Sequence, residues 1–355
     1  MGLGRKENMR ISIIVPTFNR ADTLVRCLTS VADVVAGNDD VEVLVIDNGS
    51  TDRTRATFTE IAKNYHETCW RYFYDDMPGG LTGRHLGAKE ARGEILAYTA
   101  DDVLLAPSWL DALRSAFSDP KVILVGGPSR PHYETDPPVW LNALWEEFDG
   151  GRMCGHLSLI DLGVGVRPLD PIWIWTVNFS IRKAVLHACG GFHPFFLPKS
   201  LQRYQGDGET GLALKITAKG LTGLYCPDVA VTHLIPASRL TPEYFERRAF
   251  NQGVYDSYTR IRRNGAVPPH SKKSWKDRAW PIVRELYRKA ILFRNEPKFI
   301  VSLMRRAHAA GVAFHENEVR NDPKLLGWVL KPDYFDYSLP EGWRNYLDGP
   351  LRRSY

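Results

Sequence analysis

The chain has 355 residues, 44% of them hydrophobic and 25% charged, which is the balance of a globular protein and excludes a disordered or fibrous one. No run approaches the roughly 18 consecutive apolar residues of a membrane-spanning helix. The basic N-terminus leads into a strand-like run and not into a signal sequence, so we expect a cytoplasmic protein. Five scattered cysteines without a C-x-x-C pair indicate reduced thiols and argue against a disulfide framework or a zinc site.

The net charge of +5 is unevenly distributed along the chain. Residues 239–306 contain 17 Lys and Arg against 6 Asp and Glu, so the remainder of the chain is acidic. Three interpretations of this basic segment stay open: a solvated helix surface, contact with an anionic membrane surface, and nucleic-acid binding. Because no nucleic-acid recognition motif accompanies the charge, we expect no nucleic-acid partner.

The first part of the chain alternates short apolar runs with helical segments. We expect strands at residues 11–15, 41–47, 70–76 and 94–99, a first helix capped by Asp22, a Gly-rich loop at 78–83 and a helix around 88–91. Strands separated by helical segments predict a parallel sheet with right-handed crossovers. The predicted fold class is therefore α/β, with a mostly parallel, Rossmann-like central sheet flanked by helices.

The rest of the chain has a less regular pattern. We expect a Pro-rich loop at 128–138, a strand at 173–183, an amphipathic helix at 207–220, two short strands within 222–234, and mostly helical, basic sequence from about 241 onward. No internal repeat is present. This change of pattern predicts a domain boundary near residue 238, with a helical C-terminal extension after it.

Polar side chains follow the predicted strands at their carboxyl ends, where ligands bind in parallel sheets. The most prominent are the adjacent carboxylates Asp101 and Asp102, directly behind an apolar run. Hard cations such as Mg²⁺ take one or two carboxylates together with substrate phosphates, so the pair suits a cation that bridges a diphosphate. The alternative is that both residues cap the following helix or form a turn.

A second acidic cluster, "GDGETG" at residues 206–211, precedes the predicted helix. Asp207 and Glu209 are candidates for a general base that removes a proton from an attacking hydroxyl. The competing interpretation is helix capping, because acids are common in the first turn of any helix.

Four segments, in this order and spacing, resemble the family 2 glycosyltransferases with a GT-A fold. They are "ISIIVPTFNRADTLVRCLTSV", "VEVLVIDNGSTDRT", "GRHLGAKEARGEILAYTADDVLLAPSWL" and "CGGF". The resemblance covers about residues 10–235. It implies a GT-A catalytic domain at 1–238, with a nucleotide-sugar half at about 10–127 and an acceptor half at about 128–238, and leaves 239–355 as the extension.

The resemblance also implies roles for individual residues. The nucleotide would be bound by Pro16, Thr17, Asn19, Asp47, Arg84 and Asp101. In the family's D-x-D metal motif the first acid is replaced by Ala100, and Asp102 takes the place of the metal ligand. His233 follows a predicted strand and would complete the shell around Mn²⁺ or Mg²⁺. Glu209 aligns with the family's catalytic base, with Asp207 as the alternate.

Trp173, Trp175 and Asn178 precede the base segment and are candidates for the floor of an acceptor site, although a Trp-rich strand is as often part of a core. The role of His85, where the family often has Asn, stays open.

The resulting hypothesis is that the protein is an inverting, metal-dependent glycosyltransferase of polysaccharide biosynthesis. Its donor would be a nucleotide-diphosphate sugar, and we favour a UDP-sugar. Its acceptor would be a glycan, a lipid-linked glycan or a peptide, and a lipid-linked acceptor would suit peripheral contact of the basic extension with the inner face of a membrane. Two alternatives are a non-catalytic nucleotide-sugar-binding module, favoured by Ala100, and a sugar-nucleotide nucleotidyltransferase. A NAD-dependent Rossmann enzyme is not expected, because the first strand is not followed by the G-x-G-x-x-G motif of that class.

Overall fold

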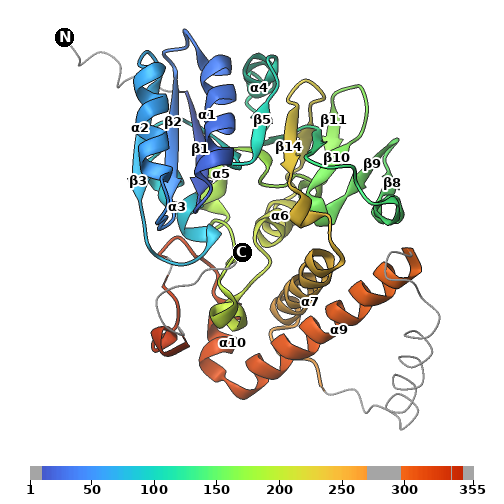
Figure 1. Cartoon of the computed structure of the whole chain (residues 1–355). Coiled ribbons are helices and arrows are strands. Elements are labelled where there is room, and N and C mark those ends of the chain that lie inside the picture. Colours follow the sequence, from blue (N-terminus) through green and yellow to red (C-terminus); the bar gives the residue numbers. More distant parts are fainter. Residues whose placement is uncertain (1–9, 270–296, 337, 347–355) are drawn as a thin grey trace.

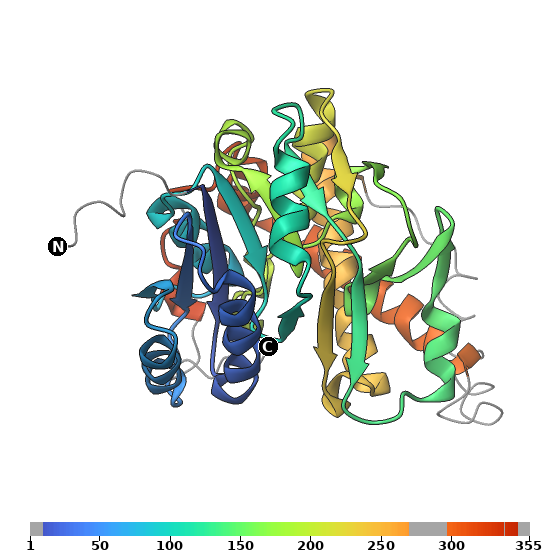
Figure 2. The ribbon, with the colours of Figure 1, turned by 90° about the horizontal axis from the view of Figure 1, so that it is seen from above.

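A computed structural model describes residues 10–269, 297–336 and 338–346, and its strands form two sheets. The first sheet has, in spatial order, β11 (Arg167–Leu169), β13 (Gly223–Tyr225), β6 (Leu124–Gly126), β12 (Asn178–Arg182), β4 (Ile95–Thr99), β1 (Ile11–Thr17), β2 (Val41–Asp47) and β3 (Cys69–Tyr74). The second has β5 (Val103–Leu105), β14 (Val231–Ile235), β7 (Ser129–Tyr133), β10 (Leu159–Asp161), β9 (Gly151–Cys154) and β8 (Glu146–Phe148). β1–β3 and β8–β10 lie on opposite sides of the molecule (Figures 1 and 2).

Helices follow most strands of the first sheet. They are α1 (Ala21–Val35), α2 (Thr54–Asn64), α3 (Gly80–Glu90), α4 (Trp109–Phe117), α5 (Lys183–Ala188) and α6 (Glu209–Ala218), and the C-terminal part adds α7 (Pro242–Asn264), α9 (Pro297–Asn321) and α10 (Pro323–Leu330). Short 3₁₀ turns are η2 (Val139–Leu144), η3 (Gly155–Leu157), η4 (Pro171–Trp173), η5 (Lys199–Tyr204), η6 (Ala237–Arg239) and η7 (Trp343–Tyr346).

The half of the first sheet formed by β4, β1, β2 and β3 is parallel, as the sequence predicts. Its central strands are short runs rich in β-branched residues that are buried on both faces, as parallel strands between two layers of helices require. Asp47 pairs with Thr17 in the register of β2 on β1, so the polar ends of these two strands lie side by side at one edge. β12 pairs antiparallel with β4 and places the segment before Asn178 at that same edge.

The helix predicted around residues 88–91 is longer than expected, and the Gly-rich stretch is not all loop. α3 already begins at Gly80, because its glycines allow the helix to pack closely on the sheet. A Cβ atom at Gly87 would lie 2.5 Å from Ile14 Cγ2, which leaves no room for a side chain.

The prediction that Asp22 caps the first helix is wrong. Arg20 is the N-cap of α1, and Asp52 accepts the hydrogen bond from Ala21 N at 3.1 Å.

Two further predictions from the sequence are corrected. The strand expected at 173–183 begins only at Asn178, because Asp170 and Pro171 start the 3₁₀ turn η4 and a turn from Trp175 to Asn178 follows it. The Pro-rich loop expected at 128–138 contains β7, which pairs in parallel with β14. Pro131 is tolerated in this short strand, although it contributes no N–H donor.

The helical C-terminal region predicted from the sequence is present in α7, α9 and α10. α7 and α9 cross below α6 in contact with each other (Figure 1). Their backbones approach closely, since a Cβ at Gly253 would lie 2.0 Å from His308 O. Leu325 and Tyr334 are buried in the same apolar cluster as Ile14 of β1. The division near residue 238 stays a prediction, and the part of the basic segment at 270–296 lies outside the described residues, as do the basic N-terminus and the end of the tail.

The five cysteines are unpaired, and four of them are buried; that they are reduced thiols stays a prediction. Among the helices within the described ranges, none combines the length and apolarity that crossing a bilayer requires.

Two buried histidines predict a pH dependence of stability. His85 Nδ1 donates to Tyr334 O at 3.1 Å and its Nε2 accepts from Phe192 N at 2.9 Å, which fixes the neutral ring. Burial lowers the pKa of His85 to about 3 and that of His315 to about 4. As the pH falls below about 6.5, both histidines take up protons in the unfolded chain but stay neutral in the folded chain. Each histidine therefore lowers the free energy of unfolding by roughly 2–3 kcal/mol by pH 4.5.

We therefore expect the free energy of unfolding, measured by urea titration, to fall by several kcal/mol between pH 7 and 4.5. His315→Gln should reduce this slope, and His66→Gln, at an exposed position, should leave it unchanged. A stability that is constant over this pH range would contradict the expectation.

Candidate active site

Asp101 and Asp102 lie in the short connection between β4 and β5, at the carboxyl edge of the parallel strands, and both are buried. The connection is held by Leu234 N of β14, which donates to Asp102 O at 2.8 Å. The next helix, α4, starts at Trp109 with Ser108 at its N-cap, so the alternative in which the acid pair caps a helix is wrong. Two adjacent buried carboxylates need positive partners to be tolerated.

Asp101 faces β1 and the turn after it. Thr17 Oγ1 donates to Asp101 Oδ2 at 2.8 Å, and Arg20 Nη1 lies 3.0 Å from Oδ1. Burial raises the pKa of Asp101, and Arg20 offsets this only in part because Asp102 stands beside it. Thr17 and Asp101, both predicted to bind nucleotide, are thus brought into direct contact.

Asp102 is bound by two guanidinium groups. Arg20 Nη1 and Arg239 Nη2 each lie 2.7 Å from its Oδ2. Burial alone would raise the pKa of this carboxyl, but Arg239 and Arg20 outweigh burial and hold it well below its usual range. Arg239 belongs to η6, just after β14, so the acid pair is neutralised from both sheets.

The residues predicted to bind metal are adjacent. His233 Nε2 lies 3.4 Å from Asp102 Oδ1, and both side chains are buried. A guanidinium can only donate, so Arg239 Nη1, at 3.0 Å, donates to Nε2 and the ring proton is on Nδ1, which has no partner in the described residues. This tautomer leaves Nε2 with the lone pair that a metal ligand needs.

A carboxylate and an imidazole nitrogen that carries a lone pair fit a divalent cation that takes its other ligands from a diphosphate. Within the described ranges, no group of three or more His, Cys, Asp or Glu gathers around one point, so the protein would supply few ligands. Arg239 would have to leave His233 Nε2 for a metal to bind there.

The other nucleotide-site candidates lie along the same edge. Asp47, buried, accepts hydrogen bonds from Ser50 N at 2.7 Å and from the Tyr72 hydroxyl, so it fixes the turn after β2. Asn19 has a left-handed backbone (φ 50°), and its Oδ1 accepts from Thr51 N at 2.7 Å, which ties the turn after β1 to the turn after β2. Pro16 pairs with Ile46 in the β1–β2 register.

Arg84 is buried in α3, and no carboxylate in the described ranges forms an ion pair with it. Its Nη2 donates to Thr176 Oγ1 at 3.1 Å, its guanidinium lies 4.5 Å from the centre of the Phe195 ring, and its Nε has no partner in the described residues. Burial lowers the pKa of Arg84 to about 10, so the side chain is still charged at neutral pH. A buried cation without an ion pair is costly unless an anionic ligand joins it. The neighbouring His85 is a structural residue held by backbone groups.

Asp207 and Glu209 have different environments. Asp207 is buried; its Oδ1 lies 2.6 Å from His193 Nδ1, and its Oδ2 accepts from Thr259 Oγ1 of α7 at 2.6 Å. Burial would raise the pKa of Asp207, but these two partners lower it overall. Glu209 is the first residue of α6, is only partly buried, and accepts no hydrogen bond from any described residue. Of the two candidate bases, Glu209 is the one whose carboxylate is available.

Asp207→Ala is expected to destabilise the fold by about 3 kcal/mol, because it leaves the buried His193 and the partly buried Thr259 without their partner. The measurement is the free energy of unfolding in urea. Asp228→Ala removes an exposed carboxylate and is the matched control, with an expected change within about 0.5 kcal/mol. Equal stabilities of the two variants would show that the buried network contributes little.

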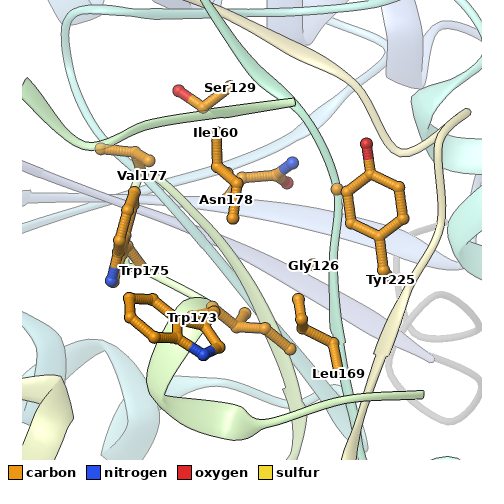
Figure 3. Close-up of a pocket in the computed structure, with 11 residues that line it drawn as sticks. Gly126, Ser129, Ile160, Leu169, Trp173, Trp175, Val177, Asn178 and Tyr225 are labelled. Atoms are coloured by element: carbon orange, nitrogen blue, oxygen red, sulfur yellow. The ribbon is translucent and has the colours of Figure 1, made fainter. Parts of the chain in front are cut away.

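The three predicted acceptor residues line one pocket. Trp173, Trp175 and Asn178 lie around it with Ser129, whose buried Oγ has no partner in the described part of the chain (Figure 3). The enclosed volume is about 10 Å³, room for about one water molecule, so a sugar ring would have to lie at its mouth. The Asn178 amide is already engaged, because its Oδ1 accepts from Trp109 Nε1 at 3.1 Å and its Nδ2 donates to Val229 O at 2.7 Å.

Some site residues were not identified from the sequence. Arg20 and Arg239 both contact the acid pair. Only Arg20 could have been predicted from the sequence, because it directly follows the polar end of a strand.

Phe196 has a left-handed backbone (φ 52°), is 43% exposed, and packs over Gly80 at the start of α3. A bulky residue in this conformation is rare and often marks a functional site.

Comparisons with known proteins find similarity to glycosyltransferases. Residues 12–166 match the family model described as Glycosyl transferase family 2. A validoxylamine A glucosyltransferase of Streptomyces hygroscopicus subsp. jinggangensis is 29% identical over 210 residues, 52% of this chain and 47% of that protein. Glycosyltransferase AglE of Haloferax volcanii is 32% identical over 120 residues, 33% of this chain and 38% of that protein. The chain therefore spans about half the length of the curated glucosyltransferase.

Among solved structures, the mannosyltransferase PcManGT of Pyrobaculum calidifontis, in complex with GDP-Man and Mn²⁺, has a TM-score of 0.53 and 19% sequence identity. The match covers 92% of this chain and 86% of that chain. At this identity the likeness shows a shared fold.

Proposed function

This chain is a member of glycosyltransferase family 2 with a GT-A fold, and on that basis we propose that it transfers a sugar, with inversion, from a nucleotide diphosphate to an acceptor hydroxyl. UDP is the nucleotide we favour. The acceptor would be a glycan, a lipid-linked glycan or a peptide.

The observation that carries this proposal is the buried acid pair Asp101–Asp102 at the carboxyl edge of the parallel strands. Positive groups from both sheets meet there, at the position where an α/β sheet binds its ligand. Thr17, Asn19 and Asp47 lie along the same edge, where a base and ribose would be bound.

Asp102 and His233 would hold a divalent cation, Mn²⁺ or Mg²⁺, which would neutralise charge on the diphosphate. Arg84 would bind the leaving diphosphate from the α3 side, where its Nε has no hydrogen-bond partner among the described residues. Glu209 would accept the proton of the acceptor hydroxyl. The hydroxyl oxygen then forms a bond to the anomeric carbon as the bond from that carbon to the diphosphate oxygen breaks.

The first experiment is a thermal-stability panel of nucleotide-sugars, including UDP-glucose, UDP-GlcNAc and GDP-mannose, each with Mn²⁺ or with EDTA. We expect one nucleotide class to raise the melting temperature in the presence of Mn²⁺, because a ligand that binds only the folded state stabilises it. If no nucleotide-sugar changes the melting temperature with either addition, the proposed donor site is wrong.

A second candidate function is a non-catalytic nucleotide-sugar-binding module. The specific observation in its favour is that Arg20 and Arg239 already neutralise the acid pair, in a motif where Ala100 replaces the first acid. This candidate predicts donor binding without release of the nucleotide.

If the acceptor is lipid-linked, we also predict peripheral membrane contact through the basic helices.

A further inference from the structure

One face of α7 is directed at the segment that begins α6. Thr259 Oγ1 donates to Asp207, two residues before Glu209, at 2.6 Å. Arg248, Tyr255 and Thr259 follow one another at seven- and four-residue intervals, which places them on the same side of a helix. Arg248 and Tyr255 therefore lie on the side of α7 that faces the candidate base.

Arg248 has a neutral hydrogen-bond partner in the part of the chain that the structure describes. Its Nε donates to His156 O at 3.3 Å. In the ranges that the structure describes, no carboxylate oxygen lies within 4.0 Å of this partly buried side chain. A partly buried guanidinium whose hydrogen-bond partner is a backbone carbonyl keeps further N–H donors that can reach an anionic ligand.

Glu209 is the carboxylate that acts electrostatically on both Arg84 and Arg248. Arg84 is also influenced by Asp101, whereas Glu209 is the one carboxylate that influences Arg248 among the described residues. Arg84 lies on the α3 side, where the proposed donor diphosphate would compensate it. Arg248 lies on the α7 side, and the donor does not account for its charge.

The Tyr255 hydroxyl is held in place beside this charge. It accepts a hydrogen bond from Gln205 Nε2 at 3.1 Å. Because Gln205 Nε2 is a donor, the hydroxyl proton of Tyr255 is available to an incoming oxygen. A guanidinium and a phenol proton together are a suitable pair for a carboxylate or phosphate oxygen.

We propose that Arg248 and Tyr255 bind an anionic group, a carboxylate or a phosphate, on the acceptor, next to the hydroxyl whose proton Glu209 accepts. The inference rests on the proposed transfer reaction and adds a substrate class to it: the acceptor is negatively charged close to the hydroxyl that is glycosylated. Arg248 is a specificity-determining residue in this scheme.

The test measures binding of three probes to the full chain saturated with UDP and Mn²⁺: glucose, glucuronate and glucose 6-phosphate. We expect at least one charged probe to bind about tenfold or more tightly than glucose, and the stronger of the two identifies carboxylate or phosphate. Arg248→Gln should remove this preference, and Tyr255→Phe should weaken it. Arg247→Gln, on the exposed side of the same helix, is the matched control and should preserve it.

Equal affinities for glucose and both charged probes in the wild type would overturn the inference, as would a preference that persists in Arg248→Gln. Stabilisation by UDP is measured for every variant, and its retention in Arg248→Gln shows that the fold and the donor site are intact. The proposed function fails separately, if the wild type shows no stabilisation by any nucleotide-sugar.

Discussion

Asp102→Ala is expected to reduce the release of nucleotide from the donor by about 10²–10³-fold or more, because it removes the carboxylate on which the candidate cation site depends. The same change also removes the carboxylate that the partly exposed Arg20 and Arg239 share. Donor binding should also weaken, and it should lose its dependence on Mn²⁺. The measurement is the initial rate of nucleotide release at saturating donor, with and without Mn²⁺.

Two variants separate this chemical effect from loss of the fold. Asp102→Asn keeps the size of the side chain and should be nearly as inactive, with a smaller loss of thermal stability. Asp111→Ala removes an exposed acid from α4 and should retain wild-type activity. An Asp102→Ala protein with activity within about threefold of wild type would remove this residue from the site.

Glu209→Ala is expected to abolish transfer to the acceptor while donor binding is kept, because the side chain would act only on the acceptor proton. General-base catalysis contributes about 10²–10⁴-fold, so the loss in kcat should fall in that range. Glu209→Gln, which keeps the shape and removes the basic carboxylate, should be equally inactive. Transfer rates and donor-induced melting shifts are measured on the same samples.

Glu246→Gln, an exposed carboxylate on α7, is the control and should retain wild-type rates. Wild-type transfer by Glu209→Ala would move the base elsewhere, first to Asp207. That result would require the pair His193–Asp207 to open, because both oxygens of Asp207 already have partners.

The parallel half of the sheet was predictable because its signals are local. Runs such as Ile11–Val15 and Val41–Asp47 are apolar, β-branched and followed by polar turns, and the structure has strands at both. The start of α3 was missed because its glycines look like a loop in the sequence. Their role is to let the helix approach Ile14, a contact between residues far apart in the chain.

The acid pair and its edge position could be predicted, whereas the cations around it could not. Arg239 lies 137 residues from Asp102 in the chain and reaches it only because β14 pairs with β5. For the same reason, the sequence alone did not separate Asp207 from Glu209. That difference arises from His193 and from α7, which bury one carboxylate and leave the other available.

The central claim is tested most directly by following an α-linked donor, UDP-glucose or the nucleotide-sugar that the thermal panel selects, by NMR in the presence of excess enzyme and Mn²⁺. We expect nucleotide to be released and the β-anomer of the sugar, in the free form or attached to a small alcohol acceptor, to form first. EDTA or Asp102→Ala should stop this reaction. Formation of the α-product first, or donor binding without any release of nucleotide, would contradict an inverting transferase at this site.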